Sequence, residues 1–285
     1  MISALELIES VKDYRVLFVG DTIIDEYHYV TSLGKSAKEN LIPVRYEYEE
    51  IFHGGVEAAA NHLKTFCKSV SISSSGHAIQ KVRFIDKDYM RKLFEVHYRN
   101  GYQPEQNHSY NYDVIVAADF GHGAIENIPE LCRESKFLAV SAQTNSANYG
   151  FNLITKYPHA DYIVIDEPEA RLAACDKDGH IEDVIYKLAQ GRCRKFVVTH
   201  GRYGAYGYED GRFYHHNAYT DLVRDTMGAG DAFFAVTAPM AKTGRMEDLL
   251  LIGNAAGAIK TGIVGHRSSV TKEVLIDFIK SHPKS

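Results

Sequence analysis

Five nearly continuous apolar runs along the chain predict the strands of a buried sheet. Such a run is typical of a strand that is covered on both faces, as in a parallel sheet. Beyond residue 114 the runs alternate with helix-like segments, so βαβ units with helices on both faces are expected. The predicted strands lie at residues 15–20, 114–118, 137–141, 162–165 and 195–199.

Other segments follow a different pattern. Residues 27–52 and 81–98 alternate loosely and are rich in β-branched and aromatic residues, which predicts strands outside the main sheet. Residues 204–214 predict a hairpin and residues 215–223 a further strand. Helices are expected at residues 3–13, 56–67, 254–262 and 270–280.

Composition narrows the class of protein. The chain of 285 residues suits one large α/β domain or two smaller ones, and its apolar content of 45% is ordinary for a globular protein. The net charge of −5 and scattered basic residues argue against nucleic-acid binding. No apolar run is long enough to span a bilayer, and acids stand where a signal peptide would be basic. The four cysteines form no CxxC pair, so a cytoplasmic protein with reduced thiols is expected.

The stretch Asp225-Thr-Met-Gly-Ala-Gly-Asp231 carries the most specific chemistry. Its glycines allow a close backbone approach, and the helix that follows begins with unpaired N–H groups that can hold an anion. Asp231 stands beside this cradle, where a carboxylate can take a proton from an attacking hydroxyl. The simpler alternative is a glycine turn whose Asp caps a helix.

The whole string D-T-x-G-A-G-D resembles the signature of the PfkB/ribokinase family of sugar kinases. The resemblance implies that Asp231 is the catalytic base and that the amides of Gly228, Ala229 and Gly230 form the anion hole. It implies an α/β, ribokinase-like three-layer sandwich with a mainly parallel central sheet and a small β lid. Residues 1–285 would be a single kinase domain, with the lid from about 27–52 and 81–98. ATP and Mg²⁺ are the implied cofactors, and a monovalent cation is allowed as a third.

The residues that would bind the acceptor substrate belong to weaker motifs. The string VGDTIIDEY and the K-x-R of Lys81 and Arg83 resemble the heptose-7-phosphate kinase branch, where basic lid residues can meet a substrate phosphate. A solvated strand face is the alternative for that pair. Family members also carry a further strand–helix unit near residues 68–80, and this chain is expected to lack it, with a narrower sheet as a result. The implied substrate-binding residues are Asp21, Asp25, Gly54, Gly55, Asn61, Lys81, Arg83 and Asp119.

The residues that would bind the metal and the nucleotide also lie in strings that resemble family motifs. Asp166-Glu-Pro-Glu169 resembles the N-x-x-E motif with Asp in place of Asn, so Glu169 and Asp166 are the candidate metal residues. Acids that merely open a helix are the alternative. A basic contact is expected to be lost where Ala142-Gln-Thr-Asn145 replaces the family's D-P-K. The implied nucleotide-binding residues are Thr199, Gly201, Gly204, Thr226 and Asn254.

These residues predict ATP-dependent phosphorylation of a hydroxyl on a sugar, sugar phosphate or polyol, heptose-phosphate-kinase-like, feeding nucleotide-activated sugar synthesis. The expected partners are a small sugar or sugar phosphate, a second copy bound through the β lid, and a separate nucleotidyltransferase, because no HxGH motif occurs here. Neither nucleic acid nor membrane is expected. One alternative is a catalytically weak homologue that binds ligand or scaffolds the nucleotidyltransferase. A dinucleotide-dependent oxidoreductase is the other, and the missing G-x-G-x-x-G counts against it.

Overall fold

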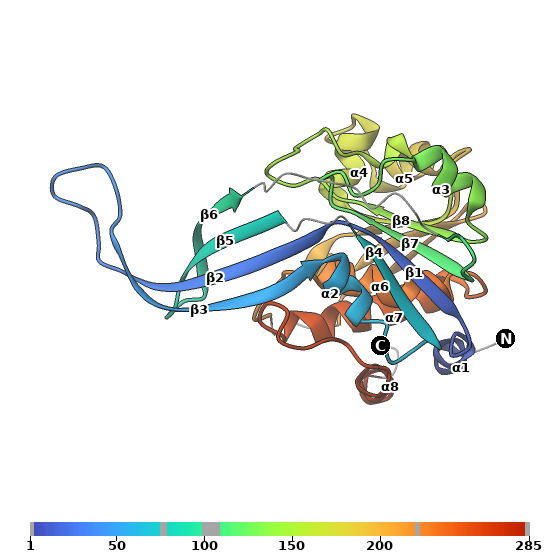
Figure 1. Cartoon of the computed structure of the whole chain (residues 1–285). Helices are drawn as coiled ribbons and strands as arrows, with labels where there is room; N and C mark the ends of the chain where they lie inside the picture. Colours follow the sequence, from blue (N-terminus) through green and yellow to red (C-terminus); the bar gives the residue numbers. More distant parts are fainter. Residues whose placement is uncertain (1–2, 75–78, 99–108, 220–222, 283–285) are drawn as a thin grey trace.

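An eight-stranded sheet forms the centre of the molecule (Figure 1). The computed structural model describes residues 3–74, 79–98, 109–219 and 223–282. Within them the strand order is β12-β11-β10-β9-β8-β7-β1-β4, parallel from β10 to β4 and antiparallel at β11 and β12. The strands span Arg15–Gly20 (β1), Ser69–Ser74 (β4), Val114–Asp119 (β7), Leu138–Ala142 (β8), Ala160–Asp166 (β9), Cys193–Thr199 (β10), Ala205–Glu209 (β11) and Arg212–His216 (β12).

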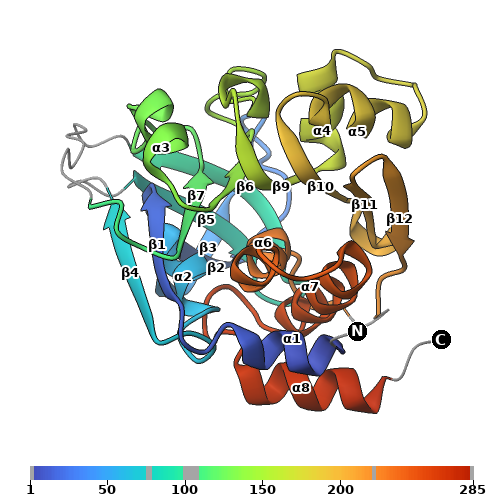
Figure 2. The same ribbon diagram turned by 90° about the vertical axis from the view of Figure 1, so that its right-hand side faces the viewer.

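Helices cover both faces of this sheet, which gives three layers (Figure 2). The apolar run of β1 shows why: Val16 and Phe18 belong to one core, whereas Leu17 and Val19 belong to the other. Helices α1, α2, α6, α7 and α8 pack on the first face, and α3, α4 and α5 on the second. The helices span Ala4–Ser10 (α1), Val56–Asn61 (α2), Ile128–Glu134 (α3), Glu167–Ala174 (α4), Ile181–Ala189 (α5), Ala229–Met240 (α6), Met246–Thr261 (α7) and Lys272–Ser281 (α8), with 3₁₀ turns at Ile154–Lys156 and Gly201–Tyr203.

A second sheet of four strands, in the order β3-β2-β5-β6, extends from one side of the sandwich (Figure 1). Tyr27, Tyr29, Phe52 and Ile85 form a small core in it, and Met227 packs against them. The Tyr27 hydroxyl also lies 2.8 Å from Met227 Sδ, which joins this sheet to the loop before α6. The four strands span Thr22–Ser32 (β2), Val44–Gly55 (β3), Ile79–Asp86 (β5) and Arg91–Tyr98 (β6).

Two sequence-based expectations differ from the structure. The segment near residues 68–80 was expected to lack a strand–helix unit, but Ser69–Ser74 forms a strand, β4, at the edge of the main sheet. Among the described residues no helix lies between β4 and β5. The alternation of serine with Val70 and Ile72 suits an edge strand, which needs fewer apolar residues than a central one. The strand expected at 215–223 ends at His216, which pairs with Ala205, the first residue of β11. The His216 carbonyl also accepts a hydrogen bond from the Asn254 side chain at 3.1 Å. Residues 220–222 of that segment lie outside the described residues.

None of the helices in the described ranges is both long enough and apolar enough to cross a membrane. All four cysteines, at positions 67, 132, 175 and 193, are free thiols.

Candidate active site

The loop before α6 presents a row of backbone amides at the start of that helix. Gly228 is the N-cap, and its φ of +73° is a left-handed conformation that favours glycine. The first N–H groups of a helix have no partner inside it. Among the described residues, the Gly228 and Gly230 amides find no acceptor, and the Ala229 amide reaches only the Thr226 carbonyl, at 3.4 Å. This turn can therefore bind an anion.

Asp231 lies in the first turn of α6, next to these amides. Its Oδ1 accepts a hydrogen bond from the side-chain amide of Gln143, which follows β8. Burial raises the pKa of Asp231, and the hydrogen bond from Gln143 opposes that rise. A carboxylate with a raised pKa is a better proton acceptor than an ordinary one, so its position suits a general base.

A cavity of about 220 Å³ opens in front of Asp231 and the amides. Asp166 and Glu169 line it from the end of β9 and the first turn of α4. These two acids form a capping box, in which Asp166 accepts from the Glu169 amide at 2.8 Å and Glu169 accepts from the Asp166 amide at 2.9 Å. The other oxygen of Glu169 accepts from the Thr144 amide at 2.9 Å. Asp166 and Glu169 therefore cap α4 and line the cavity at the same time.

The charge of these acids fits a divalent cation. Burial, together with the neighbouring charge of Asp166, raises the pKa of Glu169 to about 8. Burial also raises the pKa of Asp166. Three carboxylates around one small cavity repel one another, and Mg²⁺ prefers such oxygen ligands while keeping several waters. Because both Glu169 oxygens already accept backbone N–H groups, contact with Mg²⁺ through water fits the site better than direct ligation.

A larger cavity of about 590 Å³ adjoins the first and shares Asp166, Thr199 and Gly230 with it. Small residues on α6 and α7, including Ala229 and Gly257, leave room for a planar group between helix and loop. All five residues predicted to bind nucleotide line this cavity: Thr199, Gly201, Gly204, Thr226 and Asn254.

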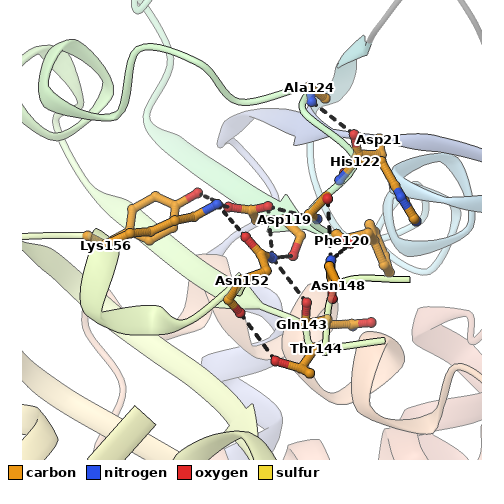
Figure 3. A network of polar contacts seen from close by, with 12 residues as sticks. Asp21, Asp119, Phe120, His122, Ala124, Gln143, Thr144, Asn148, Asn152 and Lys156 are labelled. Carbon is orange, nitrogen blue, oxygen red and sulfur yellow. Dashed lines mark hydrogen bonds and ion pairs between the residues drawn. The ribbon is translucent and has the colours of Figure 1, made fainter. Parts of the chain in front are cut away.

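Asp21 and Asp119 form a buried polar network at the ends of β1 and β7 (Figure 3). Asp21 accepts hydrogen bonds from the backbone amides of His122 at 3.2 Å and Ala124 at 2.9 Å. Asp119 accepts from the Tyr157 hydroxyl at 2.6 Å and pairs with Lys156 at 2.5 Å. Asp119 lines neither of the two cavities, and the network fixes the 120–124 loop that holds Asp21.

Asp25 belongs to β2, and His266 connects it to the loop before α6. His266 Nε2 lies 3.4 Å from Asp25 Oδ2, and a Cβ at Gly228 would lie 3.4 Å from His266 Cε1. Arg83 donates to the other oxygen of Asp25 and lies 3.3 Å from Glu95. Burial alone would raise the pKa of Asp25, but His266 and Arg83 outweigh it and hold the pKa below its usual value.

Two glycines let the chain pass close to these aspartates. A Cβ at Gly54 would lie 2.4 Å from Asp25 Oδ2, and one at Gly55 would lie 2.3 Å from the Asp21 carbonyl oxygen. Gly55 also has a φ of +62°. The structure therefore brings Asp21, Asp25, Gly54 and Gly55 together beside the start of α2.

Lys81 and Asn61 were also predicted to bind the acceptor. Lys81 lies two residues before Arg83 on β5. Its side chain is buried, and this burial lowers the pKa of Lys81. Asn61 is the last residue of α2 and lines neither cavity. Substrate contacts of both residues stay predictions.

Three site residues were not among the sequence candidates. Gln143 lies in the segment that departs from the family pattern, and that departure was its signal. His266 follows α7 in a loop without a motif, and Lys260 is a lone basic residue in a helix of small residues. Gln143 contacts Asp231, His266 contacts Asp25 and Lys260 contacts Met227, and each of these pairs is far apart in the chain, so local sequence patterns do not reveal them.

Comparison with known proteins identifies the class to which this site belongs. A profile of the pfkB family of carbohydrate kinases matches residues 107–273, more than half of the chain. The chain therefore belongs to the pfkB carbohydrate kinase family.

Individual relatives are more distant. The chain is 28% identical over 185 residues to probable fructokinase-6, chloroplastic, of Arabidopsis thaliana, a match over 54% of this chain and 47% of that protein. It thus spans about half the length of the curated relative that it matches. The fold is similar to that of Arabidopsis thaliana ribokinase solved with ribose and ATP, with a TM-score of 0.70 at 14% identity over 94% of this chain and 99% of the other. It is also similar to that of Escherichia coli phosphofructokinase-2 solved with potassium, with a TM-score of 0.72 at 11% identity over 94% and 99%. The expected ribokinase-like fold is confirmed.

Proposed function

We propose that this chain transfers the terminal phosphoryl group of ATP to a hydroxyl of a sugar or sugar phosphate. One observation carries the proposal. The carboxylate of Asp231 lies where a small acidic cavity meets a larger one, beside the Gly228 and Gly230 amides, which have no acceptor in the part of the chain that the structure describes. An acid next to an anion cradle is what transfer to an alcohol requires.

Each part of the site has a role in this reaction. ATP lies in the larger cavity, with its terminal phosphate at the 228–230 amides. The acceptor oxygen attacks phosphorus, its proton passes to Asp231, and the bond to the leaving ADP oxygen breaks. Gln143 holds the carboxylate in place and favours its ionised form. Mg²⁺ held through water near Asp166 and Glu169 neutralises phosphate charge when it is bound.

The acceptor lies between Asp25 and Asp231, under the second sheet. The Tyr27–Met227 contact supports this position, because it joins that sheet to the anion-hole loop. A lid formed by the strands of residues 27–52 and 81–98 would exclude water from the reacting groups.

For the acceptor we propose a sugar phosphate of the heptose-7-phosphate type, whose product a separate nucleotidyltransferase would consume. Two basic residues on β5, the buried Lys81 and the partly buried Arg83, support a phosphate-bearing substrate. Arg83 is already paired with Asp25 and Glu95, so binding a phosphate would require it to exchange one of these partners.

The second sheet also favours a homodimer. Its strands carry large exposed side chains that a second copy would cover, namely Tyr46, Tyr48, Ile51 and Phe94. The four free cysteines are in keeping with work in the cytoplasm. Light scattering on the wild type and on Ile51→Glu would test the dimer, and a wild-type monomer would refute it.

Activity itself is tested by comparing wild type with Asp231→Asn across a panel of sugars and sugar phosphates. ADP release should fall by about 10³-fold in the variant, while ATP binding measured by calorimetry stays within about threefold. Asp277→Asn, an exposed change on α8, is the matched control and should behave as wild type. ATP binding without turnover of any acceptor would favour the catalytically weak homologue instead.

A further inference from the structure

Lys260, near the end of α7, has a fully buried side chain with an unusual set of partners. Its ammonium donates to the backbone carbonyls of Met227 at 2.7 Å, Gly265 at 2.8 Å and Ile263 at 3.4 Å. Three acceptors match the three N–H donors of a protonated lysine, whereas a neutral amine would have only two. Lys260 is therefore held as a cation by carbonyl oxygens from two loops.

Asp225 completes this arrangement from the other side. Its two oxygens accept from the Met227 amide at 3.0 Å and the Gly265 amide at 2.9 Å, so it ties the same two loops together. Within the described ranges, no carboxylate oxygen lies within 4.0 Å of the Lys260 ammonium. The carbonyl oxygens thus take the place of the ammonium's hydration shell, as they do around a bound alkali cation.

Lys195 shows what an ordinary buried lysine looks like in the same protein. Its ammonium also donates to backbone carbonyls, those of Ala241 at 2.7 Å and Gly244 at 2.5 Å, but Glu209 lies 3.4 Å away as a counter-ion. Lys195 is buried in the core beside α6 and lines neither cavity. It therefore offers a matched control for Lys260.

The position of Lys260 gives its charge a use. Met227 directly precedes the anion-hole glycine, and a Cβ at Gly228 would lie only 3.2 Å from Lys260 Cε. Burial lowers the pKa of Lys260, while the charges of Asp225 and Asp231 act in the opposite direction. A fixed positive charge behind the amides would favour negative charge on a phosphoryl group in front of them.

We propose that the Lys260 ammonium is a built-in cation that stands in place of a diffusible monovalent cation behind the anion hole. The monovalent cation allowed by the family resemblance does not fit here, because Lys260 occupies the carbonyl oxygens of Met227, Ile263 and Gly265. The chain should therefore work without potassium. The catalytic part of this inference rests on the proposed kinase function, whereas the occupancy of the site does not.

The first test uses the wild type alone, in potassium, sodium or choline chloride at one ionic strength. The melting temperature should be the same in the three salts, and the ATP dissociation constant and the turnover number should each agree within about twofold. A saturable gain of about fivefold or more in ATP affinity or turnover with potassium would overturn the proposal. Melting and ATP binding need no turnover, so absence of kinase activity would count against the proposed function and leave this result readable.

The second test removes the Lys260 side chain and asks whether a monovalent cation can bind in its place. Lys260→Ala should lower turnover by about 100-fold in choline chloride with little change in the KM of the acceptor. Potassium or ammonium should restore a large part of the loss and raise the melting temperature of this variant. Lys260→Met fills the space without charge and should not respond to either ion. Lys195→Ala should lose stability without any potassium response. A folded Lys260→Ala that ignores potassium would refute the idea, and if that variant does not fold, the salt comparison on the wild type decides.

Discussion

The side-chain amide of Gln143 donates a hydrogen bond to Oδ1 of Asp231, which connects the loop after β8 to the first turn of α6. The same short loop reaches Glu169 through the Thr144 amide at 2.9 Å, and Phe120 through the Asn145 side chain at 2.7 Å. The segment that departs from the family's D-P-K thus touches the proposed base, the proposed metal residue and the Asp119 network. It replaces the expected basic contact with neutral hydrogen-bond donors.

Gln143→Leu should shift the acid limb of the turnover–pH profile to higher pH. A donor to the ionised carboxylate lowers the pKa of Asp231, so its removal leaves the effect of burial unopposed and raises that pKa further. A hydrogen bond to a charged group contributes about 1.5–3 kcal/mol, which corresponds to about one to two pKa units. The profile is measured from pH 5 to pH 9, with the exposed Gln190→Leu as control. An unchanged acid limb in Gln143→Leu would show that Asp231 is not the titrating base.

Asp166 should give different results when it is changed to Asn and to Ala. Asn caps a helix about as well as Asp, so Asp166→Asn should keep the unfolding free energy within about 0.5 kcal/mol, whereas Asp166→Ala should lose about 1 kcal/mol. Both variants remove a charge from the acidic cavity and should raise the Mg²⁺ concentration for half-maximal turnover by about tenfold. Urea unfolding and a magnesium titration separate the two roles. Wild-type magnesium dependence in both variants would leave Asp166 with capping alone.

Gly54→Ala should weaken acceptor binding and leave ATP binding unchanged. A Cβ there would lie 2.4 Å from Asp25 Oδ2, and Asp25 cannot move easily because Arg83 and His266 hold it. We expect the KM of the acceptor to rise about tenfold with the ATP dissociation constant unchanged. Gly150→Ala is the control, since its φ of +77° carries backbone strain but its Cβ would meet nothing within 4 Å. Equal effects of the two variants on KM would argue against Asp25 as an acceptor residue.

The fold was predictable where single strands carried their own signal. The apolar runs at 15–20 and 114–118 could only be buried on both faces, and they became β1 and β7. The alternating serines of β4 were not recognised as a strand, because an edge strand buries little and its sequence signal is weak. The end of β12 follows from its pairing with β11, which stops at Ala205, and this pairing is not visible in the sequence of residues 215–223 alone.

The candidate site was predictable to the extent that motifs are local. The string from Asp225 to Asp231 predicted the proposed base and the proposed amide cradle, and the residues predicted to bind nucleotide came together around one cavity. Asp119 is buried and contacts Lys156 and Tyr157, and its predicted contact with substrate stays a prediction. Gln143 contacts Asp231, 88 residues away, and Lys260 contacts Met227, 33 residues away, which is why sequence patterns did not show these contacts.

Gly257 offers a graded test of where the nucleotide binds. It lies on α7 in the wall of the larger cavity, and a Cβ there would meet only the Ala229 carbonyl oxygen, at an ordinary 3.6 Å. Gly257→Ala should therefore bind ATP nearly as wild type and gain up to about 1 kcal/mol of stability from its higher helix propensity. Gly257→Leu should keep that helix but fill part of the cavity, and ATP affinity should fall by about 100-fold while acceptor binding persists. Calorimetry with ATP on the three proteins, alongside urea unfolding, checks the series. Wild-type ATP affinity in a stably folded Gly257→Leu would mean that the nucleotide binds outside this cavity.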